Sequence, residues 1–181
     1  MSGTTDKNCG FTLIEVLISM LIAGLLLQAM YSVYTSSYLT FRKQEHLADA
    51  QQNARTAIQM LTRDIVMAGY STSPSPGIQF ANTTSIAIRN KTSIISFSRY
   101  SNACIGRRIG GTRQAVAENI RRLKFYYKDS TGAALPLDGS GNVITTASVR
   151  QIIISVTGRT PVFGSYSGSC TFETAITPRN L

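Results

Sequence analysis

Residues 11–31 form an almost uninterrupted apolar run, and this run constrains the fold more than any other feature of the chain. The run reads FTLIEVLISMLIAGLLLQAMY, and Glu15 is its only acidic or basic residue. About 20 apolar residues are enough to cross a bilayer core of about 30 Å. The alternative is a buried core helix, but a helix that is apolar on nearly every side fits lipid better. We therefore expect a membrane-spanning helix.

The composition argues against an enzyme. The chain has 181 residues, of which 43% are hydrophobic and 15% charged, whereas about 25% are charged in a typical soluble domain. One His, no Trp and nine acidic residues leave few groups for acid–base chemistry. We expect no catalytic residues, no metal site and no cofactor.

The ten residues before the apolar run form a polar leader, MSGTTDKNCG, in which Asp6 and Lys7 cancel. No small-x-small cleavage site follows the run, because the next residues are Ser32-Val33-Tyr34-Thr35. We therefore expect processing between the leader, residues 1–10, and the helix, which stays on the mature protein.

The junction Gly10-Phe11-Thr12-Leu13-Ile14-Glu15 resembles the signature of type IV prepilins. The resemblance implies that a membrane prepilin peptidase cuts after Gly10 and N-methylates Phe11. It also implies other pilins, an inner-membrane assembly platform and membrane lipid as partners. The protein would span the inner membrane once before assembly, and then lie in a pilus at the cell surface with its head outside the cytoplasm.

Glu15 is expected to have a charged partner. A carboxylate at membrane depth costs about 2.5–3.5 kcal/mol. Cleavage creates an α-amino group on Phe11, which lies four residues earlier on the same helix face. The partner is the amino group of the same chain or that of a neighbouring subunit. The resemblance implies the second during assembly, where the pair sets the axial register.

The helix is expected to continue past the membrane. Charged residues begin after Leu39, while apolar residues recur at steps of three and four, which is typical of an amphipathic helix. A helix over residues 12–68 would be about 85 Å long, with Gly69 as its stop. Residues 11–38 form the membrane or filament-core part, in which Gly24 is the weak point for a kink or local melting. Residues 39–181 form the head.

The head is predicted to be an antiparallel β-sheet packed on the amphipathic half of the helix, an α+β class. Pro74, Pro76 and Gly77 place a loop at residues 70–84. Alternating patterns predict strands at Ser85–Arg89, Ser93–Phe97, Ile120–Lys128, Val149–Thr157 and Cys170–Ile176.

Several of these segments resemble PilW-type minor pilins. The resemblance covers the end of the helix at Ala68-Gly69-Tyr70, the strands at 120–127 and 149–156, and the terminal residues 178–181. It implies a structural subunit that acts with other minor pilins to initiate assembly, near the pilus tip. The J-class pseudopilins of type II secretion have a similar layout and are an alternative.

Three cysteines occur in the chain, and Cys9 belongs to the leader. Cys104 and Cys170 remain in a head exposed to an oxidising compartment, where a disulfide is expected. It would close a loop of 66 residues and contribute about 4 kcal/mol. The alternative is two buried thiols; a metal site is not expected, because the only His, His46, lies on the helix and none accompanies the cysteines from residue 70 onward.

The net charge of +9 comes entirely from residue 70 onward, where 13 basic and four acidic residues lie. Three interpretations stay open for this surface: contact with DNA, as in competence pilins, contact with an acidic partner pilin, or solubility alone. The residues considered for such contacts are Arg107, Arg108, Arg113, Arg122, Lys124 and Lys128.

Overall fold

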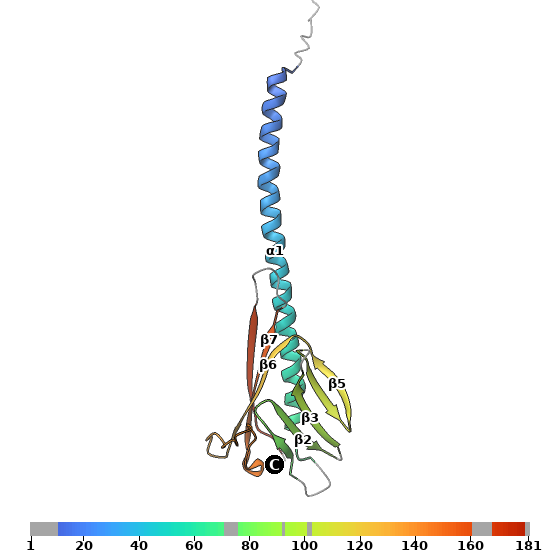
Figure 1. The fold of residues 1–181 in the computed structure, drawn as a ribbon, viewed down its shortest axis with the longest axis vertical. Helices are drawn as coiled ribbons and strands as arrows, with labels where there is room; N and C mark the ends of the chain where they lie inside the picture. Colours follow the sequence, from blue (N-terminus) through green and yellow to red (C-terminus); the bar gives the residue numbers. More distant parts are fainter. Residues whose placement is uncertain (1–10, 71–75, 92, 101–102, 161–167, 180–181) are drawn as a thin grey trace, which may run out of the picture. The chain divides into compact units, whose positions relative to one another are not determined.

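The computed structural model describes residues 11–70, 76–91, 93–100, 103–160 and 168–179. Its elements are α1 (Leu13–Val66), β1 (Ile78–Ala81), β2 (Ser85–Asn90), β3 (Ser93–Arg99), β4 (Ile105–Ile109), β5 (Thr112–Ala117), β6 (Ile120–Lys128), the short 3₁₀ helix η1 (Thr146–Ser148), β7 (Gln151–Arg159) and β8 (Ser169–Ile176). Two compact units divide the chain, Met1–Arg42 and Lys43–Leu181. Figure 1 shows these elements along the chain.

The long helix begins at a side-chain cap. The Oγ1 atom of Thr12 accepts a hydrogen bond from the backbone N–H of Glu15 at 3.3 Å. Thr followed three residues later by Glu is the spacing of a capping box, which satisfies backbone donors that a helix start leaves unpaired. The helix ends at Val66, and Gly69 adopts a positive φ of 82°, as residues just after a helix often do. The predicted helix over 12–68 is therefore confirmed to within two residues at its C-terminal end.

The first unit consists of the apolar part of α1. This part is long and apolar enough to cross a membrane, and none of it is buried by the described chain. The helix runs through Gly24 without an interruption, so this structure contains no local melting there.

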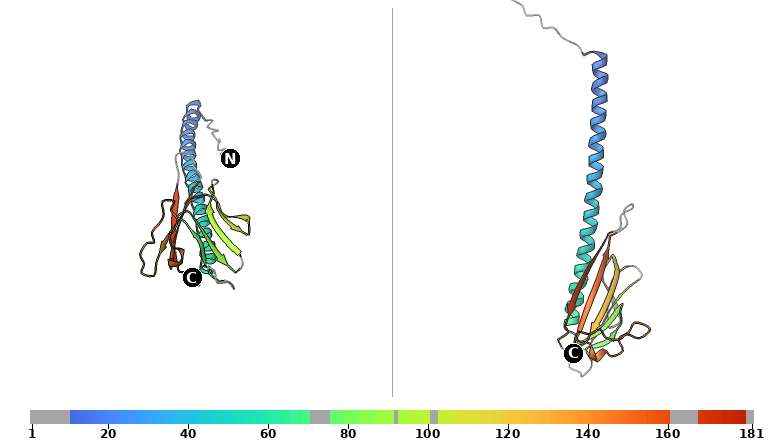
Figure 2. Two further views of the ribbon diagram at one scale, coloured as in Figure 1. Left: turned by 60° about the horizontal axis from the view of Figure 1, so that its bottom comes forward. Right: turned by 90° about the vertical axis from the view of Figure 1, so that its left-hand side faces the viewer.

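The second unit packs two antiparallel sheets against the later part of α1. The five-stranded sheet has the order β1-β2-β3-β4-β5, and the three-stranded sheet has the order β6-β7-β8. In the left view of Figure 2 the strands of the two sheets flank this part of the helix, and in the right view both sheets lie toward the same side of it. The α+β class is confirmed, but with two sheets in place of the one predicted.

Small residues on α1 let the sheets approach closely. The helix buries Ala50, Ala54 and Ala57, followed by Leu61 and Ile65 one turn at a time. A Cβ atom on Gly158 of β7 would lie 2.7 Å from the carbonyl oxygen of Ala50, which is too close. Near Ala50 the backbones of β7 and α1 pack directly against each other, whereas large side chains fill the core further along the helix. The largest of these side chains are Phe97, Phe125, Leu61, Ile65, Ile78 and Ile86.

Strand β6 follows the predicted alternation. Leu123, Phe125 and Tyr127 are buried in the core. The hydroxyl of Tyr127 donates a hydrogen bond to the carbonyl oxygen of Asn82 at 2.8 Å, which links the two sheets. Burial raises the pKa of Tyr127 far above its ordinary value of 10.0, so the hydroxyl stays protonated.

All five predicted strands are confirmed, and three strands were missed. Strand β1 lies within the segment predicted to be a loop at 70–84, of which residues 71–75 are outside the described part. Strands β4 and β5 form a hairpin around Gly110 and Gly111, where the sequence indicates only a glycine-rich loop. Both glycines have positive φ, which suits a two-residue hairpin turn.

Candidate functional site

The predicted processing site lies where the described part of the chain begins, at residue 11. Gly10, the predicted cleavage residue, lies outside the described residues, whereas Phe11 is described and is 79% exposed. Glu15 is exposed in the first turn of α1. The cap that begins the helix is formed by Thr12, so the helix start depends only on residues that follow Gly10. Cleavage after Gly10 would leave this cap intact.

In the first unit, apolar side chains are exposed on all sides of α1. Those more than half exposed include Leu13, Ile14, Leu17, Met20, Leu21, Leu25, Leu26, Met30 and Tyr31. Monomeric soluble proteins rarely expose a continuous apolar surface of this kind. Its chemistry therefore fits lipid or the apolar helices of other subunits.

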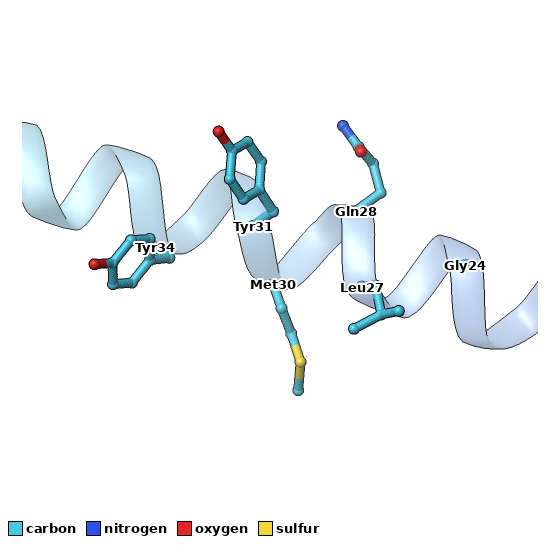
Figure 3. A pocket seen from close by; sticks show the side chains of 6 residues that line it. All are labelled: Gly24, Leu27, Gln28, Met30, Tyr31 and Tyr34. Atoms are coloured by element: carbon cyan, nitrogen blue, oxygen red, sulfur yellow. The ribbon is translucent and has the colours of Figure 1, made fainter.

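A shallow hollow interrupts this apolar surface at Gly24. Nothing lies within 4 Å of the position that a Cβ atom of Gly24 would occupy. Figure 3 shows the side chains around it, with Tyr31 and Gln28 on one side of the helix and Met30 on the other. Because a single helix forms the hollow, another helix has room to approach its backbone there.

An aromatic ladder marks the end of the apolar unit. The rings of Tyr34 and Tyr38 stack with centroids 6.4 Å apart, and the guanidinium of Arg42 lies 5.9 Å from the Tyr38 ring centroid. The three residues follow one another at steps of four, so they share one helix face. Tyrosines and basic residues in this order are typical of the boundary between a bilayer and water.

One comparison with known families bears on this helix. The sequence profile described as "Prokaryotic N-terminal methylation motif" matches residues 5–31.

The chain carries a prepilin-type methylation motif.

This motif indicates a type IV pilin-like protein or pseudopilin and so suggests a structural role. It implies processing by a prepilin peptidase and assembly with other pilins. The apolar helix and the motif together fit a membrane-anchored pilin. A comparison with curated proteins finds no match to the chain.

The basic residues considered for partner contacts do not form one cluster. Arg107 points into the second unit, where its Nε donates to Oδ2 of the buried Asp64 at 2.7 Å. Arg108 and Arg113 are exposed and directly opposite each other on β4 and β5. The remaining three, Arg122, Lys124 and Lys128, lie on β6 in the other sheet.

The two head cysteines are not joined in this structure. Cys104 follows Ala103, whose carbonyl accepts a hydrogen bond from Ile120 of β6. Ile120 pairs with Gly158 of β7, and Gly158 pairs with Cys170 of β8. The disulfide between Cys104 and Cys170 therefore stays a prediction.

Asp129 and Asp138 stabilise loops of the head by accepting hydrogen bonds. Oδ1 of Asp129 accepts hydrogen bonds from the hydroxyl and backbone N–H of Thr131, and these lower the pKa of Asp129. The side chain and backbone of Asn142 lower the pKa of Asp138 in the same way. Within the described residues, no three His, Cys, Asp or Glu side chains come together as a metal site would need.

Sequence reasoning missed two features of the site. The first is the Thr12 cap, for which the Thr-x-x-Glu spacing was an available signal. The second is the pair of Asp64 with Arg107, which are 43 residues apart. No local pattern predicts that pair, because it depends on how β4 packs against the helix.

Proposed function

We propose that this protein is a minor pilin of a type IV pilus, which waits in the inner membrane and then joins other minor pilins in initiating the filament near its tip. The observation that carries this proposal is the apolar surface of α1, which the described chain leaves exposed from Phe11 to Phe41. A membrane can cover this surface before assembly, and neighbouring helices can cover it afterwards.

Glu15 has a specific part in this proposal. Its carboxylate pairs with the methylated amino group of Phe11 on a neighbouring subunit, which fixes the axial position of one helix against the next. The hollow at Gly24 and the apolar side chains around it supply the packing surface. The carboxylate fixes the axial position of one helix against its neighbour, which apolar contacts alone would not determine.

The variant Glu15→Val tests this role. We expect processing to continue, because the peptidase acts at Gly10 and Phe11, and membrane insertion to persist, because a costly carboxylate is removed. Incorporation into filaments should fall about tenfold or more, since an unpaired buried ammonium costs several kcal/mol. The measurement is the ratio of variant to wild type in sheared filaments, alongside the processed protein in membranes.

Glu15→Asp is the matched control, because it keeps the charge and shortens the side chain by one methylene. Its incorporation should lie between those of the wild type and Glu15→Val. Normal incorporation of processed Glu15→Val would contradict the role of the pair.

A deletion strain separates the pilus from a secretion pseudopilus. Loss of this protein should reduce the number of surface pili while type II secretion of exported enzymes stays normal. The opposite result, normal pili with failed secretion, would assign the protein to the J-class pseudopilins and would overturn the pilus assignment.

A further inference from the structure

The charged side chains of the five-stranded sheet are all basic. Residues 78–117, which span β1 to β5, contain six basic residues and no acidic residue. One of the six, Arg107, points inward and is neutralised by Asp64. The cations on the outer face therefore have no carboxylate from their own sheet to balance them.

The strand register places two arginines side by side on this face. Arg108 of β4 and Arg113 of β5 are directly opposite each other, and Ser96 of β3 continues the same row. Like charges directly opposite each other destabilise a hairpin. An arrangement that costs stability in the free protein is relieved when an anion binds over it.

Separate contacts hold the two guanidinium groups apart. Nε of Arg108 donates to the carbonyl oxygen of Gly111 at 3.3 Å, which draws that side chain toward the hairpin turn. The guanidinium of Arg113 lies 3.3 Å from the ring centroid of Tyr100. That ring rests on Gly106, away from the turn, and a Cβ atom at Gly106 would collide with it. The two cations thus lean in opposite directions along the hairpin.

The row next to the arginine pair contains Ser85, Ser98, Gly106 and Ala115, all with small side chains. The Tyr100 ring covers Gly106, so this row stays low only at the two serines. An extended ligand can therefore lie close to the sheet at Ser85 and Ser98 and pass beside the Tyr100 ring. Serine hydroxyls and arginine guanidinium groups are among the groups that contact the phosphates of nucleic acids.

We propose that this face, through Arg108 and Arg113, binds the phosphodiester backbone of a nucleic acid. Two cations that lean apart do not converge on a single phosphate, whereas a polymer with repeating phosphates engages both. Binding of this kind depends on charge and reads no base sequence. It is a function beyond the structural role in the filament, and it depends on residues that lie far along the chain from Glu15.

The test uses the full chain in neutral detergent micelles and a fluorescein-labelled DNA duplex, with affinity followed by fluorescence anisotropy. The double variant Arg108→Gln/Arg113→Gln should bind about tenfold or more weakly, since two charge-assisted hydrogen-bonding groups are lost. The slope of log affinity against log salt should become shallower by about two, one for each phosphate contact. Arg108→Lys/Arg113→Lys should restore most of the slope, because the charges return.

The matched control is Arg121→Gln/Arg122→Gln, which removes the same charge from exposed residues of β6. It should bind the duplex within about twofold of the wild type. An equal loss in both double variants would show that net charge alone controls binding and would overturn the proposal. So would unchanged binding by the Arg108/Arg113 variant with an unaltered melting curve.

Two competitors separate the sources of negative charge. Polyglutamate at matched charge should displace the duplex poorly, and so should inorganic phosphate at matched phosphate concentration. Full displacement by polyglutamate would indicate an acidic protein partner, and full displacement by inorganic phosphate would indicate a site for single phosphates. Either result would overturn the assignment to a nucleic-acid backbone.

Discussion

At the residue scale, the internal pair of Asp64 and Arg107 joins β4 to α1. The side chain of Asp64 is 9% exposed and that of Arg107 is 18% exposed, so water screens the pair only partly. Removing one member of a buried ion pair leaves an uncompensated charge, whereas replacing both with apolar residues is often neutral. The two members therefore stabilise the fold jointly.

A double-mutant cycle measures this coupling. Asp64→Leu and Arg107→Met should each lower the free energy of unfolding by about 3 kcal/mol, because each leaves the other charge buried. The combined variant should lie within about 1 kcal/mol of the wild type. Chemical denaturation of the full chain in detergent gives all four values. Additive losses in the double variant would show that the two residues act independently.

The same pair shows why a residue's role is hard to derive from its neighbours in sequence. Arg107, Arg108 and Arg113 lie within seven positions, and nothing in the sequence distinguishes their roles. Strand alternation sends Arg107 inward and Arg108 outward, and the hairpin brings Arg113 beside Arg108. Because β4 and β5 were not predicted, neither was this separation.

At the element scale, the close approach of β7 to α1 depends on glycine. Gly158 lies over Ala50, and the position of its missing Cβ is 2.7 Å from the Ala50 carbonyl oxygen and 3.1 Å from the Cys170 sulfur. The helix backbone cannot move aside without shifting the buried alanines that follow it. Any side chain at position 158 must therefore push the strand from the helix.

Gly158→Ala should lower the free energy of unfolding by about 1–3 kcal/mol through this overpacking. Gly139→Ala is the matched control, because nothing lies within 4 Å of its Cβ position and its φ is not positive. The control should change stability by less than about 0.5 kcal/mol. Denaturation of both variants under the same conditions checks the prediction, which equal losses would contradict.

Elements with a long periodic signal could be predicted from the sequence, and short ones could not. The helix was predicted because its apolar and amphipathic stretches extend over more than 50 residues. Strands β6 and β7 were predicted because their buried positions alternate over nine residues. Strand β1 has only four residues, and it follows a proline and a glycine that indicate a loop.

At the scale of the whole molecule, two units meet two different environments. The unit before Lys43 exposes apolar side chains that water does not favour, and the unit after Arg42 has its own core and carries the net positive charge. The methylation motif ties the first unit to pilin-like assembly. The motif over residues 5–31 could be predicted from the sequence, because it depends on consecutive residues and not on tertiary packing, and cleavage between Gly10 and Phe11 stays a prediction.

The mature N-terminus tests this account most directly. Protein purified from membranes should give an intact mass for the 171 residues that remain after the first ten of 181 are removed, with one added methyl group. Terminal sequencing should place that methyl group on the amino group of Phe11, and Gly10→Val should leave the leader attached. A mature chain that begins at Met1, or one that begins beyond residue 31 and so lacks the apolar helix, would contradict the account.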